Sequence, residues 1–199
     1  MRPGARLRAL LWFVLLIGAI APALAQDIAA GERKYGICAS CHGIEGRSFK
    51  PHYPILAGQN ARYLLRQLQD FKEHRRGDPN MDAVVTALSA QDMRDLAEFF
   101  ASRKPGFGGF KADRSRAARG RIRTRAASCG KCHTGNGAST VSAFPQVFGQ
   151  HRDYVVKQLL DFRDGRRTND GGVMGQIAQG MTDAYIDDLG NYLAGLPDR

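Results

Sequence analysis

Apolar residues recur every three to four positions along most of the chain, which is the spacing of helices that are buried on one side. Residues 60–73 place Leu64, Leu68 and Phe71 on one face, and residues 151–164 repeat that spacing. Sustained alternation of apolar and polar residues, the mark of a half-buried strand, is missing from the sequence. The pattern predicts an all-α protein.

The last helix of each half has a recognisable start. Ser89 precedes an apolar stripe and is followed three residues later by Asp92, which is the arrangement of a capping box. Thr182 holds the same place ahead of a second stripe. Between the halves, the glycines and proline of residues 104–109 end any helix, and we expect residues 117–128 to be helical again.

The two halves are copies of one another. The motif Cys38-x-x-Cys41-His42 recurs 91 residues later as Cys129-x-x-Cys132-His133. The same register pairs Pro54 with Pro145, Gly58-Gln59 with Gly149-Gln150, Tyr63 with Tyr154, Gln67-Leu68 with Gln158-Leu159, and Phe71 with Phe162. After a shift of two residues, Met81 pairs with Met174. The chain therefore contains two homologous domains in tandem.

The first 25 residues have the composition of an export signal. Three arginines precede an apolar run over residues 9–20, and Ala23-Leu24-Ala25 suits cleavage just before Gln26. An uncleaved membrane anchor is the alternative, but the run is short for a membrane span and is followed by Pro22. We expect a signal peptide over 1–25, a first domain over 26–104, a basic Gly/Arg-containing linker over 105–116 and a second domain over 117–199.

All four cysteines lie in the two Cys-x-x-Cys-His motifs. Thiols three positions apart lie on one side of a helical turn, where they add to the two vinyl groups of a haem while the next residue turns its imidazole to the iron. A thioredoxin-type or structural disulfide leaves the His unexplained. A zinc site places its two pairs about 15–20 residues apart, much closer than here. We expect two covalent haem c groups, held by Cys38, Cys41 and His42 and by Cys129, Cys132 and His133.

The second axial ligand of each iron is expected to be a methionine, whose soft thioether stabilises reduced iron and closes the site. Met81 and Met174 both follow turn-rich loops, at equivalent places in the repeat. Met93 and Met181 have no methionine counterpart and lie in apolar surroundings, which indicates core packing. Met81 and Met174 are therefore the predicted ligands.

The remaining histidines share no position in the repeat, so we expect His52, His74 and His151 to be solvated surface residues. The repeated prolines, Pro54 and Pro145, have two interpretations. A metal-bound His donates its other ring N–H to a fixed acceptor, and a carbonyl at a rigid proline would serve. Alternatively, both are ordinary turn prolines.

Each half is small, and a buried haem would supply apolar volume that so short a chain lacks, so we expect each domain to fold poorly without it. Gly31 and Gly120 lead into the two cysteine motifs. We hypothesise that they let the first helix of each half cross closely under the last.

Taken together, these motifs resemble the dihaem cytochrome c4 family over nearly the whole mature chain. The resemblance rests on the paired haem motifs, the Pro-x-x-x-Gly-Gln segments at 54–59 and 145–150, the Tyr-x-x-x-Gln-Leu-x-x-Phe helices at 63–71 and 154–162, and the Arg-Arg pairs at 75–76 and 166–167. It implies two class I cytochrome c domains with His/Met iron in each. It also implies that the carbonyls of Pro54 and Pro145 accept from the haem-binding histidines.

The sequence departs from the family pattern in two places. The second motif continues His133-Thr134-Gly135 where the first has His42-Gly43, and the linker is unusually rich in arginine. The formal net charge is +10, and residues 101–125 carry nine basic residues against Asp113 alone. So local a surplus does not predict a nucleic-acid-binding face. It either steers acidic partners or anionic lipid, or is a solvated connection beside the haem propionates.

Saturated His/Met ligation leaves no position for a substrate, so we expect a periplasmic single-electron carrier and not an enzyme. One expected role is a shuttle between a quinol-oxidising membrane complex and a terminal oxidase. A second is the cytochrome subunit of a flavoprotein dehydrogenase, such as the sulfide-oxidising type. A dihaem peroxidase is a third. It would need an iron with an open coordination position, and the two equivalent methionines argue against such a position. Association with a membrane surface also remains open.

Overall fold

The computed structural model describes residues 27–133 and 143–195. The predicted signal peptide and the Thr134-Gly135 departure lie outside this part of the chain. Every regular element within the described residues is a helix, as predicted. The helices are α1 (Ile28–Lys34), α2 (Gly36–His42), η1 (Ile44–Gly46), α3 (Ala61–Lys72), α4 (Pro79–Thr86), α5 (Ala90–Ser102), α6 (Arg114–Ala126), η2 (Cys129–Lys131), α7 (Arg152–Arg163), α8 (Val173–Ala178) and α9 (Asp183–Ala194).

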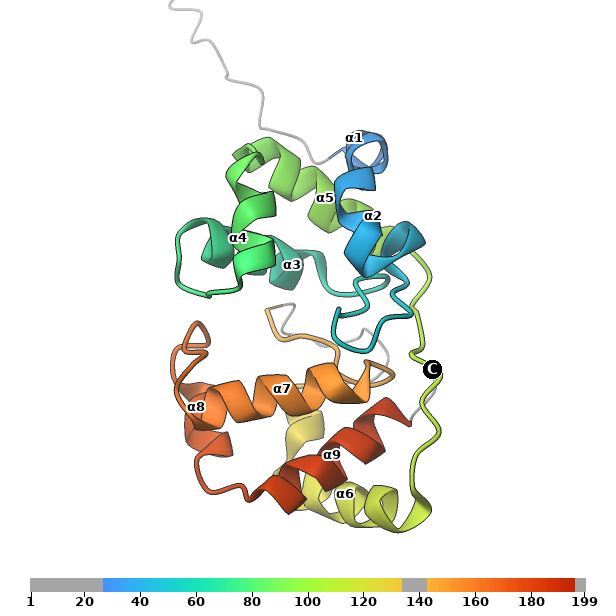
Figure 1. The fold of residues 1–199 in the computed structure, drawn as a ribbon, viewed down its shortest axis with the longest axis vertical. Coiled ribbons are helices and arrows are strands. Elements are labelled where there is room, and N and C mark those ends of the chain that lie inside the picture. Colours follow the sequence, from blue (N-terminus) through green and yellow to red (C-terminus); the bar gives the residue numbers. More distant parts are fainter. Residues whose placement is uncertain (1–26, 134–142, 196–199) are drawn as a thin grey trace, which may run out of the picture.

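The helices form two lobes, α1–α5 and α6–α9, joined by an extended segment that runs along one side (Figure 1). Each lobe has its own apolar core. Helices α3 and α7 lie where the repeat predicts them, and their buried faces include Leu64 and Phe71 in the first and Val155 and Phe162 in the second. Among the described residues, no helix combines the length and the apolar character needed to cross a bilayer.

Side-chain caps define the helix starts. Ser89 and Asp92 form the predicted capping box at α5, and Thr182 accepts a hydrogen bond from the backbone of Tyr185 at α9. Helix α6 begins at Arg114, three residues before the helix expected over 117–128. The reason is a cap inside the predicted linker: the Asp113 carboxylate accepts from Arg116 N at 2.8 Å.

Two glycines bring the first and last helices of each lobe into backbone contact, as hypothesised. A Cβ atom on Gly31 of α1 would lie 2.3 Å from the carbonyl oxygen of Asp95 in α5. A Cβ on Gly120 of α6 would lie 2.1 Å from the carbonyl oxygen of Asp188 in α9. No real side chain fits at such distances, so the crossing needs glycine.

The lobes are joined by two amide clasps that the repeat relates to each other. The Gln59 side chain donates to Gln146 O at 2.9 Å and accepts from Gln146 N at 2.8 Å. The Gln150 side chain donates to Ile55 O at 3.0 Å and accepts from Ile55 N at 2.8 Å. Gln150 is the repeat partner of Gln59, and Gln146 is the repeat partner of Ile55. The interface therefore has approximate twofold symmetry.

A second reciprocal contact involves two arginines, of which Arg167 is buried and Arg76 is half-buried. Arg76 donates to Tyr154 and Gln158 of the other lobe, each at 2.9 Å. Arg167 donates to Tyr63 at 3.2 Å and to Gln67 at 2.9 Å. We call this set the arginine–tyrosine network; its members are Tyr63, Gln67, Arg76, Tyr154, Gln158 and Arg167. Each lobe thus contributes one arginine, one tyrosine and one glutamine to the interface.

One prediction about the histidines is wrong. His52 and His74 are exposed, but His151 is only 4% exposed, and its Nε2 lies 2.8 Å from Ser48 O in the other lobe. Its repeat partner Asn60 also crosses the interface, donating to Phe144 O at 2.5 Å. Positions 60 and 151 are thus equivalent in the repeat and both lie at the interface, but they carry different side chains. Matching identical residues between the two halves does not detect such a pair.

The helix crossing generates a stability prediction. In Gly31→Ala, the new methyl group must displace the α5 backbone, so we expect the free energy of unfolding of the full haem-loaded chain to fall by about 2 kcal/mol. Guanidinium unfolding followed by circular dichroism measures it. Gly36→Ala is the matched control, because a Cβ there meets no atom within 4 Å. Equal stabilities of the two variants would show that the crossing is not tight.

The amide clasps generate a second prediction. Gln150→Ala leaves the buried N–H and C=O of Ile55 without partners, and we expect a loss of about 2 kcal/mol of stability. The looser interface should also speed tryptic cleavage of the segment between the lobes, which contains Arg103 and Lys111. Gln179→Ala, at the exposed residue that follows α8, is the control and should change neither quantity. Unchanged cleavage in Gln150→Ala would mean that the clasp does not hold the lobes together.

Candidate functional site

The two cysteine motifs occupy equivalent places but different local structures. The first lies on α2, whose last residue is His42. The second begins on the 3-10 turn η2 and continues through Cys132 to His133. All four thiols are free of disulfide bonds. Each motif therefore presents two thiols and one imidazole within a single turn of chain.

Both motif histidines are oriented by a proline carbonyl. His42 Nδ1 lies 2.9 Å from Pro54 O, and His133 Nδ1 lies 2.8 Å from Pro145 O. A carbonyl only accepts, so Nδ1 carries the proton and Nε2 keeps its lone pair. Burial lowers the pKa of both imidazoles, although each proline hydrogen bond opposes the shift. Both rings are therefore neutral near pH 7 and present Nε2 as a metal ligand.

An aromatic ring stands edge-on to each imidazole. The ring centres of His42 and Tyr53 are 6.1 Å apart, and those of His133 and Phe144 are 6.2 Å apart. Tyr53 and Phe144 precede the two proline residues that accept from the histidines. The same loop thus supplies both the hydrogen-bond acceptor and the aromatic ring beside each imidazole.

The first thiol of each motif is not activated as a redox nucleophile. Burial, with a smaller contribution from Cys41, raises the pKa of Cys38 to about 11, and burial likewise raises the pKa of Cys129. Thioredoxin-type cysteines have lowered pKa values. Within the described ranges, no three Cys, His, Asp or Glu side chains come together as a metal-ion site. Neither the redox-disulfide nor the zinc alternative gains support.

Met81 and Met174 each lie in the first turn of a short helix, α4 and α8. The Asp78 carboxylate accepts from Met81 N at 3.3 Å, and the Asp170 carboxylate accepts from Met174 N. Neither aspartate is among the predicted site residues. Their signal is an Asp three or four residues before each methionine, at the start of a helix.

Partly buried apolar side chains line the edge of each core at matching positions. The matching pairs are Leu56 and Val147, Leu65 and Val156, Leu68 and Leu159, and Met81 and Met174. Met93 and Met181, by contrast, are 5% and 8% exposed inside the cores, as predicted. Two thiols, a neutral imidazole, a thioether and an apolar rim are the groups that a covalently bound, flat haem requires, so the residues fit this cofactor.

Comparison with known proteins gives the same result. The sequence profile of the cytochrome c family matches residues 28–104. Cytochrome c4 of Pseudomonas aeruginosa is 41% identical over 182 residues, covering 86% of this chain and 90% of the relative. The crystal structure of reduced recombinant cytochrome c4 from Pseudomonas stutzeri superposes with a TM-score of 0.80 at 38% identity, covering 87% of this chain and all of that one. A protein of Stutzerimonas stutzeri named thiosulfate dehydrogenase electron acceptor is 33% identical, covering 81% of this chain and 80% of the relative.

The fold class and the cofactor follow from these matches. The chain is an all-α protein of two tandem class I cytochrome c domains, and it binds two covalent haem c groups. It transfers electrons between redox partners and is not an enzyme. With its repeat, its two equivalent sites and relatives that match nearly end to end, the chain belongs to the cytochrome c4 family.

Proposed function

We propose that each domain holds its haem in a closed His/Met site. Cys38 and Cys41 would form the thioethers of the first haem, with His42 and Met81 as axial ligands. In the second domain the thioethers would come from Cys129 and Cys132, and the axial ligands would be His133 and Met174. The single observation that supports this most is the repetition of both supports, His to proline carbonyl and Met N–H to Asp carboxylate.

The bound haem supplies one-electron redox chemistry at its iron. The protein's part is to keep the ligand set unchanged when the electron arrives or leaves. The proline carbonyls fix the imidazole planes, and the aspartates fix the backbone from which each methionine extends. With both axial positions taken by side chains, no position is left for a substrate, which favours transfer over catalysis.

The proposed setting is the periplasm, reached through a signal peptide over residues 1–25. There the protein would carry single electrons from a quinol-oxidising membrane complex to a terminal oxidase. Two haem sites in domains joined by a symmetric interface suit a carrier that accepts and releases one electron at a time.

A second role is favoured by a specific comparison. Two relatives are named thiosulfate dehydrogenase electron acceptors, at 33% and 30% identity. The chain would then accept electrons from a sulfur-oxidising dehydrogenase, close to the expected role as the cytochrome subunit of a flavoprotein dehydrogenase. The site is the same in both roles, and only the donor differs.

The axial ligands are tested by the far-red absorption band of Met-ligated ferric haem. We expect two haems per chain in the wild type. In each of the single variants Met81→Ala and Met174→Ala we expect half of the wild-type band, because each variant loses one of the two thioether ligands. Met93→Leu and Met181→Leu are matched controls that keep the full band, since a leucine of similar volume fills the core. An intact band in Met81→Ala or Met174→Ala would reject that residue as a ligand.

The donor is tested by rapid mixing of the oxidised protein with candidate partners. A quinol-oxidising complex with quinol, and a thiosulfate dehydrogenase with thiosulfate, are each followed by the rise of the reduced-haem absorbance. We expect the physiological donor to reduce both haems at least about tenfold faster than the other donor, because a matched surface steers association. Equal slow rates with both would exclude both roles.

A further inference from the structure

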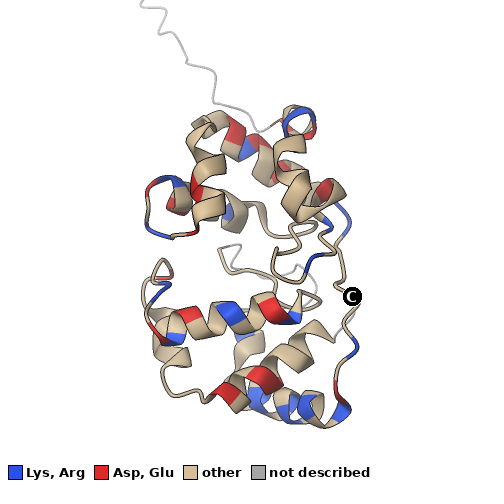
Figure 2. Ribbon diagram, viewed as in Figure 1, with Lys and Arg blue, Asp and Glu red and all other residues tan. Residues whose placement is uncertain are grey.

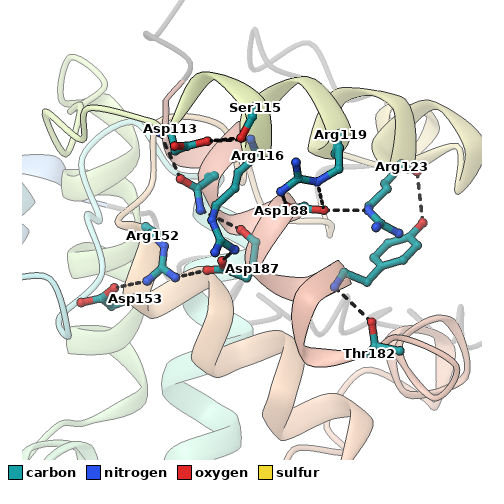
Figure 3. A network of polar contacts seen from close by, with 12 residues as sticks. Asp113, Ser115, Arg116, Arg119, Arg123, Arg152, Asp153, Thr182, Asp187 and Asp188 are labelled. Atoms are coloured by element: carbon teal, nitrogen blue, oxygen red, sulfur yellow. Dashed lines mark hydrogen bonds and ion pairs between the residues drawn. The ribbon is translucent and has the colours of Figure 1, made fainter.

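The six arginines of α6 divide into two sets. Arg119 and Arg123 donate to the buried carboxylate of Asp188 at 2.9 and 3.1 Å, and Arg116 pairs with Asp187 (Figure 3). The hydrogen bond from Arg119 holds the pKa of Asp188 below its ordinary value. These three arginines face α9 and join the two helices. Their positive charge is neutralised by carboxylates of the same domain.

The other three lie on the outward side of the helix. Arg114, Arg121 and Arg125 are exposed, and their spacing of seven and four residues aligns them along about 16 Å of one side of α6. Figure 2 shows basic residues at several places along this helix. Within the part of the chain that the structure describes, none of these three arginines has a carboxylate at ion-pair distance. We call these three residues the arginine row. Its charge is available to another molecule.

Among the residues that the structure describes, α1 of the first domain carries no such row. Counted from the crossing glycine of each helix, Arg121 corresponds to Glu32 and Arg125 to Gly36. The basic residue Lys34 of α1 is paired with Asp92. The two domains share a fold and a haem motif, but their leading helices α1 and α6 differ in exposed charge.

The arginine row leads to the second haem motif. Helix α6 ends three residues before Cys129 and contacts η2, on which Lys131 is exposed. Cys132, the second thiol of that motif, is exposed as well. Helix α6 lies at the end of the second domain, away from the first (Figure 1). A molecule bound along the row would therefore meet the second cysteine pair and not the first.

We propose that the arginine row, with Lys131, docks an acidic surface of a redox protein, so that the partner exchanges electrons through the second domain. This rests on the proposed function as an electron carrier. Three exposed arginines on one side of α6, with exposed Lys131 just beyond the end of the helix, complement a carboxylate-rich patch. The charges also steer the encounter, and such steering weakens with salt.

An anionic membrane is the competing occupant. A helix that lies in a membrane surface buries a broad apolar face beside its basic residues. The outward side of α6 offers one large apolar residue, Ile122, which is 65% exposed. The buried positions of the helix, Gly120 and Thr124, are against its own domain. Charge without an apolar face favours a protein partner.

The test uses the full haem-loaded chain and a reduced plant-type ferredoxin, a small acidic iron–sulfur protein, as the probe. The row variant carries Arg121→Glu and Arg125→Glu. The control carries Arg33→Glu and Arg62→Glu, which change the net charge equally at exposed positions of the first domain. Stopped-flow spectroscopy gives the reduction rate at low and at high ionic strength. Hexaammineruthenium(II), a small cation, serves as a reductant that needs no docking.

We expect the ferredoxin rate of the row variant to fall at least about tenfold at low salt, that of the control to stay within about twofold, and the difference to vanish at high salt. Equal losses in both variants would overturn the proposal, because net charge alone would then explain them. An unchanged ferredoxin rate, with sedimentation on phosphatidylserine vesicles lost in the row variant, would assign the row to lipid. Failure of hexaammineruthenium(II) to reduce the wild type would instead reject the carrier function itself.

Discussion

The close crossing of the first and last helices is the constraint on which each domain depends. At Gly31 and Gly120 a backbone touches a backbone, and the cysteine motif follows a few residues later on the same stretch of chain. The crossing therefore fixes where the thiols stand relative to the core. The second domain has two more residues than the first between its glycine and its first cysteine. Its leading helix has 13 residues against 7 in the first domain, and the arginines lie along this longer helix.

The interface places two positive charges where water is scarce. Arg76 and Arg167 donate to tyrosine and amide oxygens, and the hydrogen bonds described for them include no carboxylate. Burial opposes ionisation of Tyr154, but the neighbouring guanidinium groups of Arg76 and Arg167 outweigh it and lower its pKa. Charges held in this way need several fixed dipoles around them, so the network makes the relative position of the domains specific.

Much of this structure could be predicted because the chain contains its own comparison. Matching residues such as Met81 and Met174, or Pro54 and Pro145, stand out only since a second copy is present. Comparing the two halves does not predict features that only one copy has, or contacts between residues far apart in the sequence. His151 looked like a surface residue because nothing in the sequence says which faces of the two domains meet. Asp113 lies within the predicted linker although it caps α6, because a single Asp between glycines and arginines is a weak signal in the sequence.

The reciprocal glutamine clasps bear on the evolutionary origin of a two-domain chain. Each domain offers the same donors and acceptors that it receives, which is the property of a self-complementary interface in a symmetric dimer. Two copies of one ancestral domain could have paired in this way before their genes were fused. Fusion makes the pairing intramolecular, at an effective concentration in the millimolar range. Once the pair could no longer dissociate, the two faces were free to diverge, as Asn60 and His151 have done.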